Sequence, residues 1–188
     1  MPKYGRPEPK SLVDSFIASD RVPALDRDKP LVESDVWNIL SEVLDPEVPV
    51  LSVVDLGIVR TVSLSGEAVS IEVTPTYSGC PATELIEDLI RETLNAYGFR
   101  HISLIQKLSP AWTTDWITPE GKEKLRAYGI APPKSNSKLS LMGHAAVVSC
   151  PVCGSSHTQQ VSEFGSTACK ALYRCLDCLE PFDYFKCI

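Results

Sequence analysis

Two Cys-x-x-Cys pairs near the end of the chain restrict its fold more than any other feature. Cys150-Pro-Val-Cys153 and Cys175-Leu-Asp-Cys178 are separated by 21 residues, which is the spacing of a four-cysteine zinc ribbon. Each pair forms a tight turn, or knuckle, that directs two thiolates at one ion, and Gly154 stands where the chain must turn after the first pair. Four ordinary thiols or two disulfides would be the alternative. The paired spacing favours a structural zinc site.

Two further cysteines leave the ligand set open. Cys169, Cys175 and Cys178 have the spacing Cys-x5-Cys-x2-Cys. This is one residue longer than the plant-type Cys-x4-Cys-x2-Cys run that holds an iron–sulfur cluster. Cys169 is therefore an alternative ligand or a free thiol, and Cys187 has the same ambiguity. Because two complete knuckles satisfy tetrahedral geometry by themselves, we assign zinc to the four knuckle cysteines.

The 188 residues are sufficient for two small domains. Proline-rich residues 1–30 predict an extended arm, residues 31–133 an α/β domain, the polar residues 134–144 a linker, and residues 145–188 the ribbon. No apolar run is long enough to span a membrane and no signal-peptide core is present. We therefore expect a cytoplasmic protein whose cysteines stay reduced.

The charge distribution argues against nucleic acid as a partner. Residues 31–133 contain 7 basic and 15 acidic residues, and residues 145–188 contain 3 and 4. A nucleic-acid-binding ribbon needs a basic surface to displace phosphate counterions, and neither region has one.

Hydrophobic periodicity predicts an α-β-β-α-β layer for the first domain. A helix is expected from a Ser34 cap to Pro46, and a hairpin turns at Ser65-Gly66 between strands at 58–64 and 69–73. A second helix opens at Pro81, a strand follows at 102–108, and a short helix begins after Thr118. The predicted class is α+β, with a β-rich ribbon after the layer. If the second and third strands are neighbours, the crossover through the second helix is expected to be right-handed and parallel.

Three groups of residues in this domain could carry chemistry. Cys80 directly precedes the second helix, where the helix dipole stabilises a thiolate, although a small buried residue is an equal alternative. Asp45, Glu47 and Asp55 could bind a cation, but Asp-Pro is also a common turn. Two aromatic residues after the last strand would cover the core or, if exposed, contact a partner protein; these are Trp112 and Trp116.

The motifs around these residues resemble known families. The first domain is similar to the iron–sulfur cluster assembly domain called domain of unknown function 59, through Asp45-Pro46-Glu47, Asp55-Leu56-Gly57, Gly79-Cys80-Pro81 and Pro110-x-Trp112. Together with the ribbon segments Phe164–Cys175 and Glu180–Cys187, residues 31–188 resemble the D-subunit family, also called J, of bacterial phenylacetyl-CoA 1,2-epoxidases.

This resemblance implies an accessory role in aerobic phenylacetate catabolism, with iron or iron–sulfur maturation of the epoxidase as the leading hypothesis. Its partners would be the di-iron oxygenase subunits and a reductase with flavin and a [2Fe–2S] cluster. Cys80 would be a transient iron or cluster ligand, with Asp45, Glu47 and Asp55 as positioning groups. The sequence has no Glu-x-x-His pair at its three histidines and no Gly-x-Gly-x-x-Gly turn, so catalysis by this chain is not expected. A purely structural brace and an iron–sulfur electron-transfer protein are the alternatives.

Overall fold

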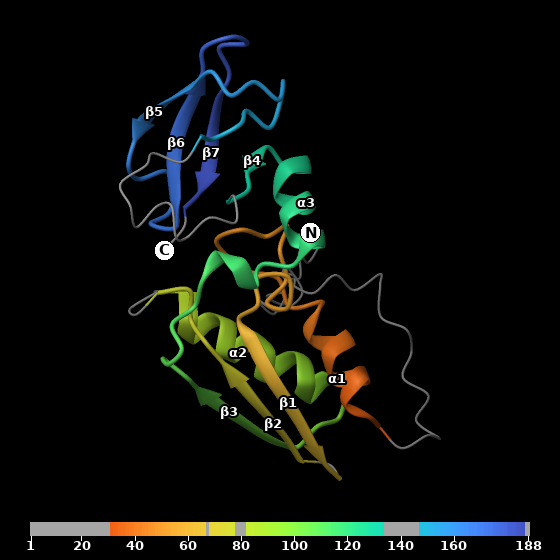
Figure 1. Cartoon of the computed structure of the whole chain (residues 1–188). Helices are drawn as coiled ribbons and strands as arrows, with labels where there is room; N and C mark the ends of the chain where they lie inside the picture. The colour runs from red at the N-terminus through yellow and green to blue at the C-terminus, as the bar shows by residue number, and fades with distance from the viewer. Residues whose placement is uncertain (1–30, 67, 78–81, 134–146, 187–188) are drawn as a thin grey trace, which may run out of the picture.

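The predicted α-β-β-α-β order is present in the computed structural model, which describes residues 31–66, 68–77, 82–133 and 147–186. The elements of the first layer are α1 (Glu33–Leu40), β1 (Val59–Ser65), β2 (Ala68–Val73), α2 (Ala82–Ala96) and β3 (His101–Gln106). The sheet order is β1-β2-β3, with β1 and β2 antiparallel and β2 and β3 parallel. Helices α1 and α2 cover one face of this sheet (Figure 1).

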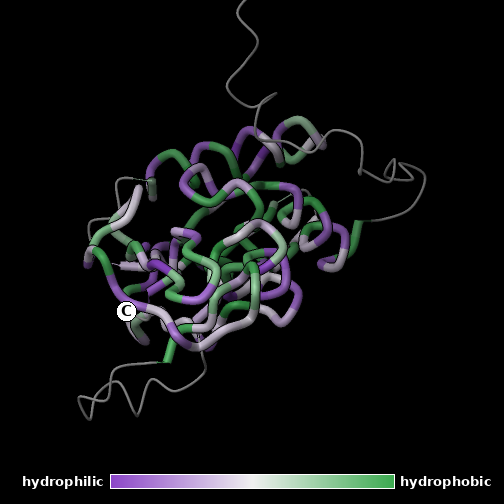
Figure 2. Tube along the Cα trace, turned by 90° about the horizontal axis from the view of Figure 1, so that it is seen from above, coloured by the Kyte–Doolittle hydropathy of each residue, from purple (hydrophilic) through white to green (hydrophobic). Residues whose placement is uncertain are grey.

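Apolar and polar residues alternate along β2, and this explains why helices cover one face of the sheet. Val69, Ile71 and Val73 of β2 are 1%, 0% and 2% exposed, and they share one face because successive strand residues point to opposite sides. The amphipathic α2 supplies the other half of this core with Ile86, Leu89 and similar residues. Figure 2 shows hydrophobic (green) and hydrophilic (purple) stretches interleaved along the trace of the described residues.

Helix α1 differs from its prediction at both ends. Its N-cap is Val32, whose N–H donates to the Asp35 carboxylate, so the predicted Ser34 cap is wrong. The helix ends at Leu40 rather than continuing to Pro46. The following loop is held by its own bonds, such as Asp45 N–H to the Leu51 carbonyl at 2.8 Å, and it buries Val43 and Leu51 without helical structure.

The ribbon forms a second sheet from β5 (Thr158–Ser162), β6 (Lys170–Cys175) and β7 (Pro181–Phe185). The two-residue strand β4 (Ile130–Ala131), which lies at the end of the first domain, pairs in parallel with β7 at the edge of this sheet. The strand order is β4-β7-β6-β5. Strand β4 follows α3 (Pro119–Ala127), whose Thr118 cap accepts a bond from Gly121 N–H at 2.9 Å. A short 3-10 helix, η2 (Thr114–Trp116), lies between β3 and α3. The two sheets are therefore linked by α3 and β4 (Figure 1).

Gly57 provides a stability test of the loop before β1. Its φ is +67°, and a Cβ added there would lie 2.5 Å from the Trp116 carbonyl oxygen. We expect Gly57→Ala to lower the free energy of unfolding by about 2–4 kcal/mol, because the strained backbone conformation and the clash add together. Gly66→Ala is the matched control, since its φ is +61° but nothing lies within 4 Å of the added atom. Denaturant unfolding of both variants measures the difference, and equal losses would contradict the role of the clash.

Candidate metal centre and interdomain pocket

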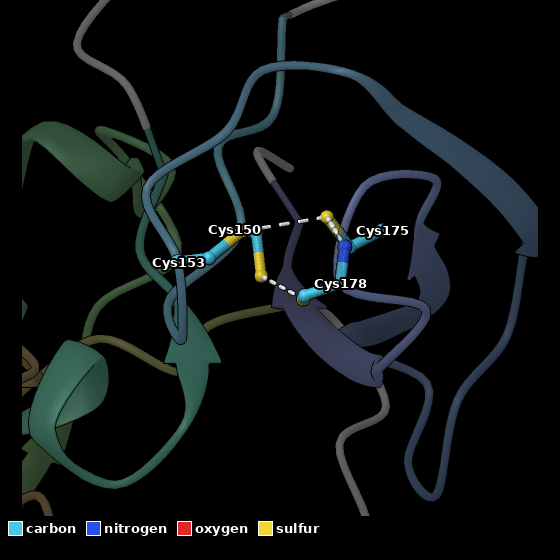
Figure 3. A group of neighbouring side chains, drawn as sticks. All are labelled: Cys150, Cys153, Cys175 and Cys178. Carbon is cyan, nitrogen blue, oxygen red and sulfur yellow. Dashed lines mark hydrogen bonds between the residues drawn. The ribbon is translucent and has the colours of Figure 1, made fainter.

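The four knuckle cysteines converge on one point. Cys150 and Cys153 precede β5, Cys175 ends β6, and Cys178 lies in the turn before β7 (Figure 3). Their sulfur atoms all lie within 4.8 Å of one another. The Cys150–Cys178 and Cys153–Cys175 sulfur separations are 3.7 and 3.6 Å. A tetrahedral zinc site with Zn–S bonds of about 2.3 Å has edges of about 3.8 Å, so the four thiols fit one such ion.

The two knuckles adopt matching turns although only one has glycine. Gly154 has a φ of +76° after the first pair, and Leu179 has a φ of +66° at the equivalent place after the second pair. Leu179 is thus a leucine in the left-handed region, which normally favours glycine. In this second knuckle the backbone N–H of Cys178 donates to the Cys175 sulfur at 3.5 Å. Backbone N–H groups, that of Cys178 foremost, lower the pKa of Cys175 to about 7, which favours the thiolate that a metal requires.

A polar group on the surface connects the knuckles. Ser155, after the first pair, donates to the carboxylate of Asp177, inside the second pair. His157 Nδ1 lies 3.0 Å from the other oxygen of the same carboxylate. The hydrogen bond from Ser155 is the larger cause that holds the pKa of Asp177 below its usual value, followed by the one from His157. Sequence reasoning missed this link, because the spacing of Ser155, His157 and Asp177 has no motif of its own.

Cys169 lies outside the four-thiol group. It is 4% exposed and comes just before β6, whereas Cys175 ends that strand. Its sulfur lies 3.6 Å from Glu47 Oε2 and 3.0 Å from Thr167 Oγ1. Burial, and to a lesser extent the Glu47 carboxylate, raise the pKa of Cys169 to about 11, so the thiol stays protonated. Cys187, the other open position, lies outside the described residues.

A small cavity is lined by Cys169 together with residues of the first domain. Its volume is about 20 Å³, which is room for about one water molecule. Asp45 and Glu47 line it with Cys169, as do Thr76 and Thr83. Cys80, which the sequence singled out, lies outside the described residues, but Thr76 and Thr83 stand on either side of it in the chain. The remaining lining residues are mainly apolar and include Leu56, Ile58, Val73, Ile86 and Phe185.

The three predicted carboxylates separate into two groups. Asp45 is 7% exposed and accepts bonds from the N–H groups of Glu47 and Val48 at 2.8 and 2.7 Å. Burial raises the pKa of Asp45 above its usual value, because the two N–H groups offset the lost hydration only in part. Asp45 and Glu47 therefore come together at the cavity, whereas Asp55 does not line it.

Asp55 instead holds α3 to the loop before β1. Its carboxylate accepts from Ser52 N–H at 2.9 Å and from Lys124 Nζ at 2.6 Å, and its carbonyl accepts from Thr118 N–H at 2.9 Å. Burial opposes ionisation, but the bonds from Lys124 and Ser52 outweigh it and hold the pKa of Asp55 below its usual value. These contacts give Asp55 a structural role.

The two tryptophans occupy different environments. Trp112 is 3% exposed, donates from Nε1 to the Leu56 carbonyl at 2.9 Å, and packs against Phe185 of β7 with ring centroids 6.3 Å apart. Burial of this side chain corrects the hypothesis that Trp112 is an exposed partner contact, and agrees with core packing. Trp116 is half-buried, and the Arg60 guanidinium lies 3.6 Å from its ring centroid.

Comparisons with known proteins agree with this two-part architecture. A model of the iron–sulfur cluster assembly protein family matches residues 33–98, and the PaaD zinc beta ribbon domain matches residues 134–186. Within the described part of the chain, no helix is both long enough and apolar enough to cross a membrane. The fold and the four-thiol group therefore define an iron–sulfur assembly-type domain joined to a zinc-ribbon domain.

Similar proteins identify the family more narrowly. An Escherichia coli K12 protein, provisionally named as the D subunit of 1,2-phenylacetyl-CoA epoxidase, is 55% identical over 157 residues, covering 82% of this chain and 92% of its own. The chain belongs to this D-subunit family of phenylacetyl-CoA epoxidases. A Porphyromonas gingivalis "Fe-S protein maturation auxiliary factor" is 30% identical over 95 residues, covering 50% of this chain and 90% of its own. The crystal structure of a domain of unknown function 59 from Bacillus anthracis is 26% identical, with a TM-score of 0.47, covering 50% of this chain and 90% of that chain.

Proposed function

We propose that Cys150, Cys153, Cys175 and Cys178 hold one structural zinc ion. The sulfur separations of 3.6 and 3.7 Å support this proposal, as does the match to a zinc ribbon family. Four thiolates leave no open position for substrate or water, so the ion would stabilise the ribbon and supply no catalysis.

We further propose that the chain is a cytoplasmic, noncatalytic accessory subunit of a phenylacetyl-CoA epoxidase and assists its iron or iron–sulfur maturation. The observation that carries this proposal is the 55% identity to a D-subunit protein across nearly the whole of that relative, in a chain that also matches an iron–sulfur assembly family. Ring oxygenation would belong to the di-iron oxygenase subunits, and electron supply to the flavin and [2Fe–2S] reductase.

Within this function, Cys80 is the proposed transient ligand for the iron cargo. Asp45 and Glu47 line the cavity that Thr76 and Thr83 also line, and these threonines flank Cys80 in the chain by only a few residues. A thiolate together with carboxylates suits ferrous iron or an iron–sulfur cluster. The ribbon would add a docking surface for the component that receives iron.

Coexpression of the epoxidase components with this chain tests the maturation proposal. We expect Cys80→Ser to leave this protein folded while the purified oxygenase or reductase loses at least half of its iron, because the transfer thiol is missing. Cys187→Ser is the matched thiol control and should leave iron loading unchanged. Metal analysis of the partner subunits gives the readout, with circular dichroism of each variant as the folding control.

Other outcomes of the same experiment separate the alternative functions. Full iron content and normal epoxidase turnover with Cys80→Ser would overturn the transfer role and favour a structural brace. A brown preparation of this chain, purified without oxygen and showing reversible bleaching on reduction, would favour electron transfer through a cluster.

A further inference from the structure

The β6–β7 hairpin connects the four-thiol group to the first domain. Cys175 ends β6 and Cys178 lies in the turn that leads to β7, so the proposed zinc ligands stand at one end of the hairpin. At the opposite end, Lys170 of β6 pairs with Phe185 of β7. The hairpin therefore runs from the four-thiol group at one end to the cavity at the other, where Cys169 and Phe185 are lining residues.

Contacts at that opposite end form what we call the seam, defined by Cys169, Lys170 and Phe185 of the ribbon with Glu47 and Trp112 of the first domain. The Cys169 thiol donates to the Glu47 carboxylate at 3.6 Å, and Lys170 Nζ donates to the Glu47 carbonyl at 3.3 Å. Cys169 and Phe185 are 4% and 2% exposed and belong to the hydrophobic core of the first domain. The ribbon therefore supplies part of the wall of the first domain's cavity.

Apart from the seam and the two-residue pairing of β7 with β4, the ribbon has little but the metal to hold this hairpin in place. Among the described residues its buried cluster has seven members, six from the ribbon and one from β4: Ala131, Val148, Cys150, Ala171, Cys175, Phe182 and Tyr184. Two of these are proposed metal ligands. Domains of about 40 residues rarely fold on such a core without a metal or disulfides, and metal binding to thiolates then supplies folding free energy.

We propose that metal binding at the four knuckle cysteines closes the seam, so that the ribbon's metal content controls access to the cavity beside Glu47. With the metal bound, the hairpin presses Phe185 against Trp112 and buries Cys169 against Glu47. When the metal leaves, the hairpin loosens, Cys169 becomes accessible, and the loop over residues 45–58 loses the contacts that hold it. This inference rests on the proposed metal site but does not depend on which cargo or partner the protein serves.

Chemical labelling and hydrogen exchange of the full-length protein test this coupling. The metal is removed with a chelator under reducing conditions, and its loss is measured by metal analysis. Alkylation of Cys169 is followed in the peptide 164–170, released by cleavage after Glu163 and Lys170, in which it is the single cysteine. We expect alkylation of Cys169 to become at least about tenfold faster, and amide exchange over 45–58 to rise, while exchange in the centre of α2 stays unchanged.

A metal-loaded variant shows whether the hairpin itself transmits the effect. Phe185→Ala should keep its metal, because it lies at the far end of the hairpin from the knuckles, and yet raise amide exchange over 45–58. Val161→Ala is the matched control on β5, since Val161 is 59% exposed, and should change neither quantity. The inference is overturned if metal release or Phe185→Ala leaves exchange over 45–58 as it was. A protein that binds no metal in any preparation would overturn the zinc proposal, and the inference with it.

Discussion

Replacing Cys175 by serine is expected to abolish metal binding and unfold the ribbon. Cys175 is fully buried and belongs to the four-thiol group, and a serine hydroxyl is a poor replacement for a zinc-bound thiolate. Structural zinc contributes about 10–16 kcal/mol of apparent binding free energy in small domains, so a ribbon that no longer binds its metal loses the main term that stabilises its fold. Metal analysis should show a fall from about one ion per chain to nearly none, and amide exchange across β5, β6 and β7 should approach that of an unfolded chain.

Cys169→Ser is the matched control for this prediction, because it removes a buried thiol from the same domain without touching the four-thiol group. It should retain the full metal content. Metal loss with Cys169→Ser and retention with Cys175→Ser would show that the ligand set includes Cys169 instead, which is the alternative that the spacing of the cysteines raised.

Trp112→Ala is expected to lower the free energy of unfolding by about 3–5 kcal/mol, the usual cost of deleting a large aromatic side chain from a core. Trp112 is 3% exposed, donates to the Leu56 carbonyl and contacts Phe185 of the ribbon. The variant therefore creates a cavity where the two domains meet. Denaturant unfolding followed by circular dichroism measures the loss.

Two comparison variants separate packing from hydrogen bonding. Trp112→Phe keeps an aromatic ring and should cost only about 1–2 kcal/mol, mostly from the buried Leu56 carbonyl left without its donor. Trp116→Ala should cost less, about 1–2 kcal/mol, because the Trp116 side chain is only partly buried at the edge of the core and carries Arg60 over its ring. Similar losses for Trp112→Ala and Trp116→Ala would contradict the core role of Trp112.

Local patterns in the sequence predicted the elements of the first domain well. Alternation around Ser65-Gly66 predicted the hairpin of β1 and β2, and the apolar stripe of α2 predicted which residues it buries. The end of α1 was predicted too late, because Val43 and Leu51 are buried by a loop that continues the apolar pattern without helical structure. Hydrophobic periodicity reports burial, and a well-packed loop can imitate the end of a helix.

The candidate site was predictable only where its residues are close in sequence. The two knuckles place four thiols within 4.8 Å through short turns, so their spacing predicted the grouping. For Asp55 and Trp112 the sequence left binding and structural roles open, and the structure shows that they contact Lys124 and Leu56, 69 and 56 residues away. Nothing in the local sequence distinguishes a carboxylate or an indole used for packing from one used for binding.

The amino-acid sequence alone determined the α-β-β-α-β order of the first domain and the two metal-binding turns, because backbone propensity and short-range spacing are encoded within a few residues. Only the tertiary structure decided that β4 joins the ribbon sheet and that Cys169 meets Glu47 across 122 positions of the chain. Such contacts form when two separately patterned surfaces bury each other, and the free energy gained depends on their shapes in three dimensions rather than on either segment alone.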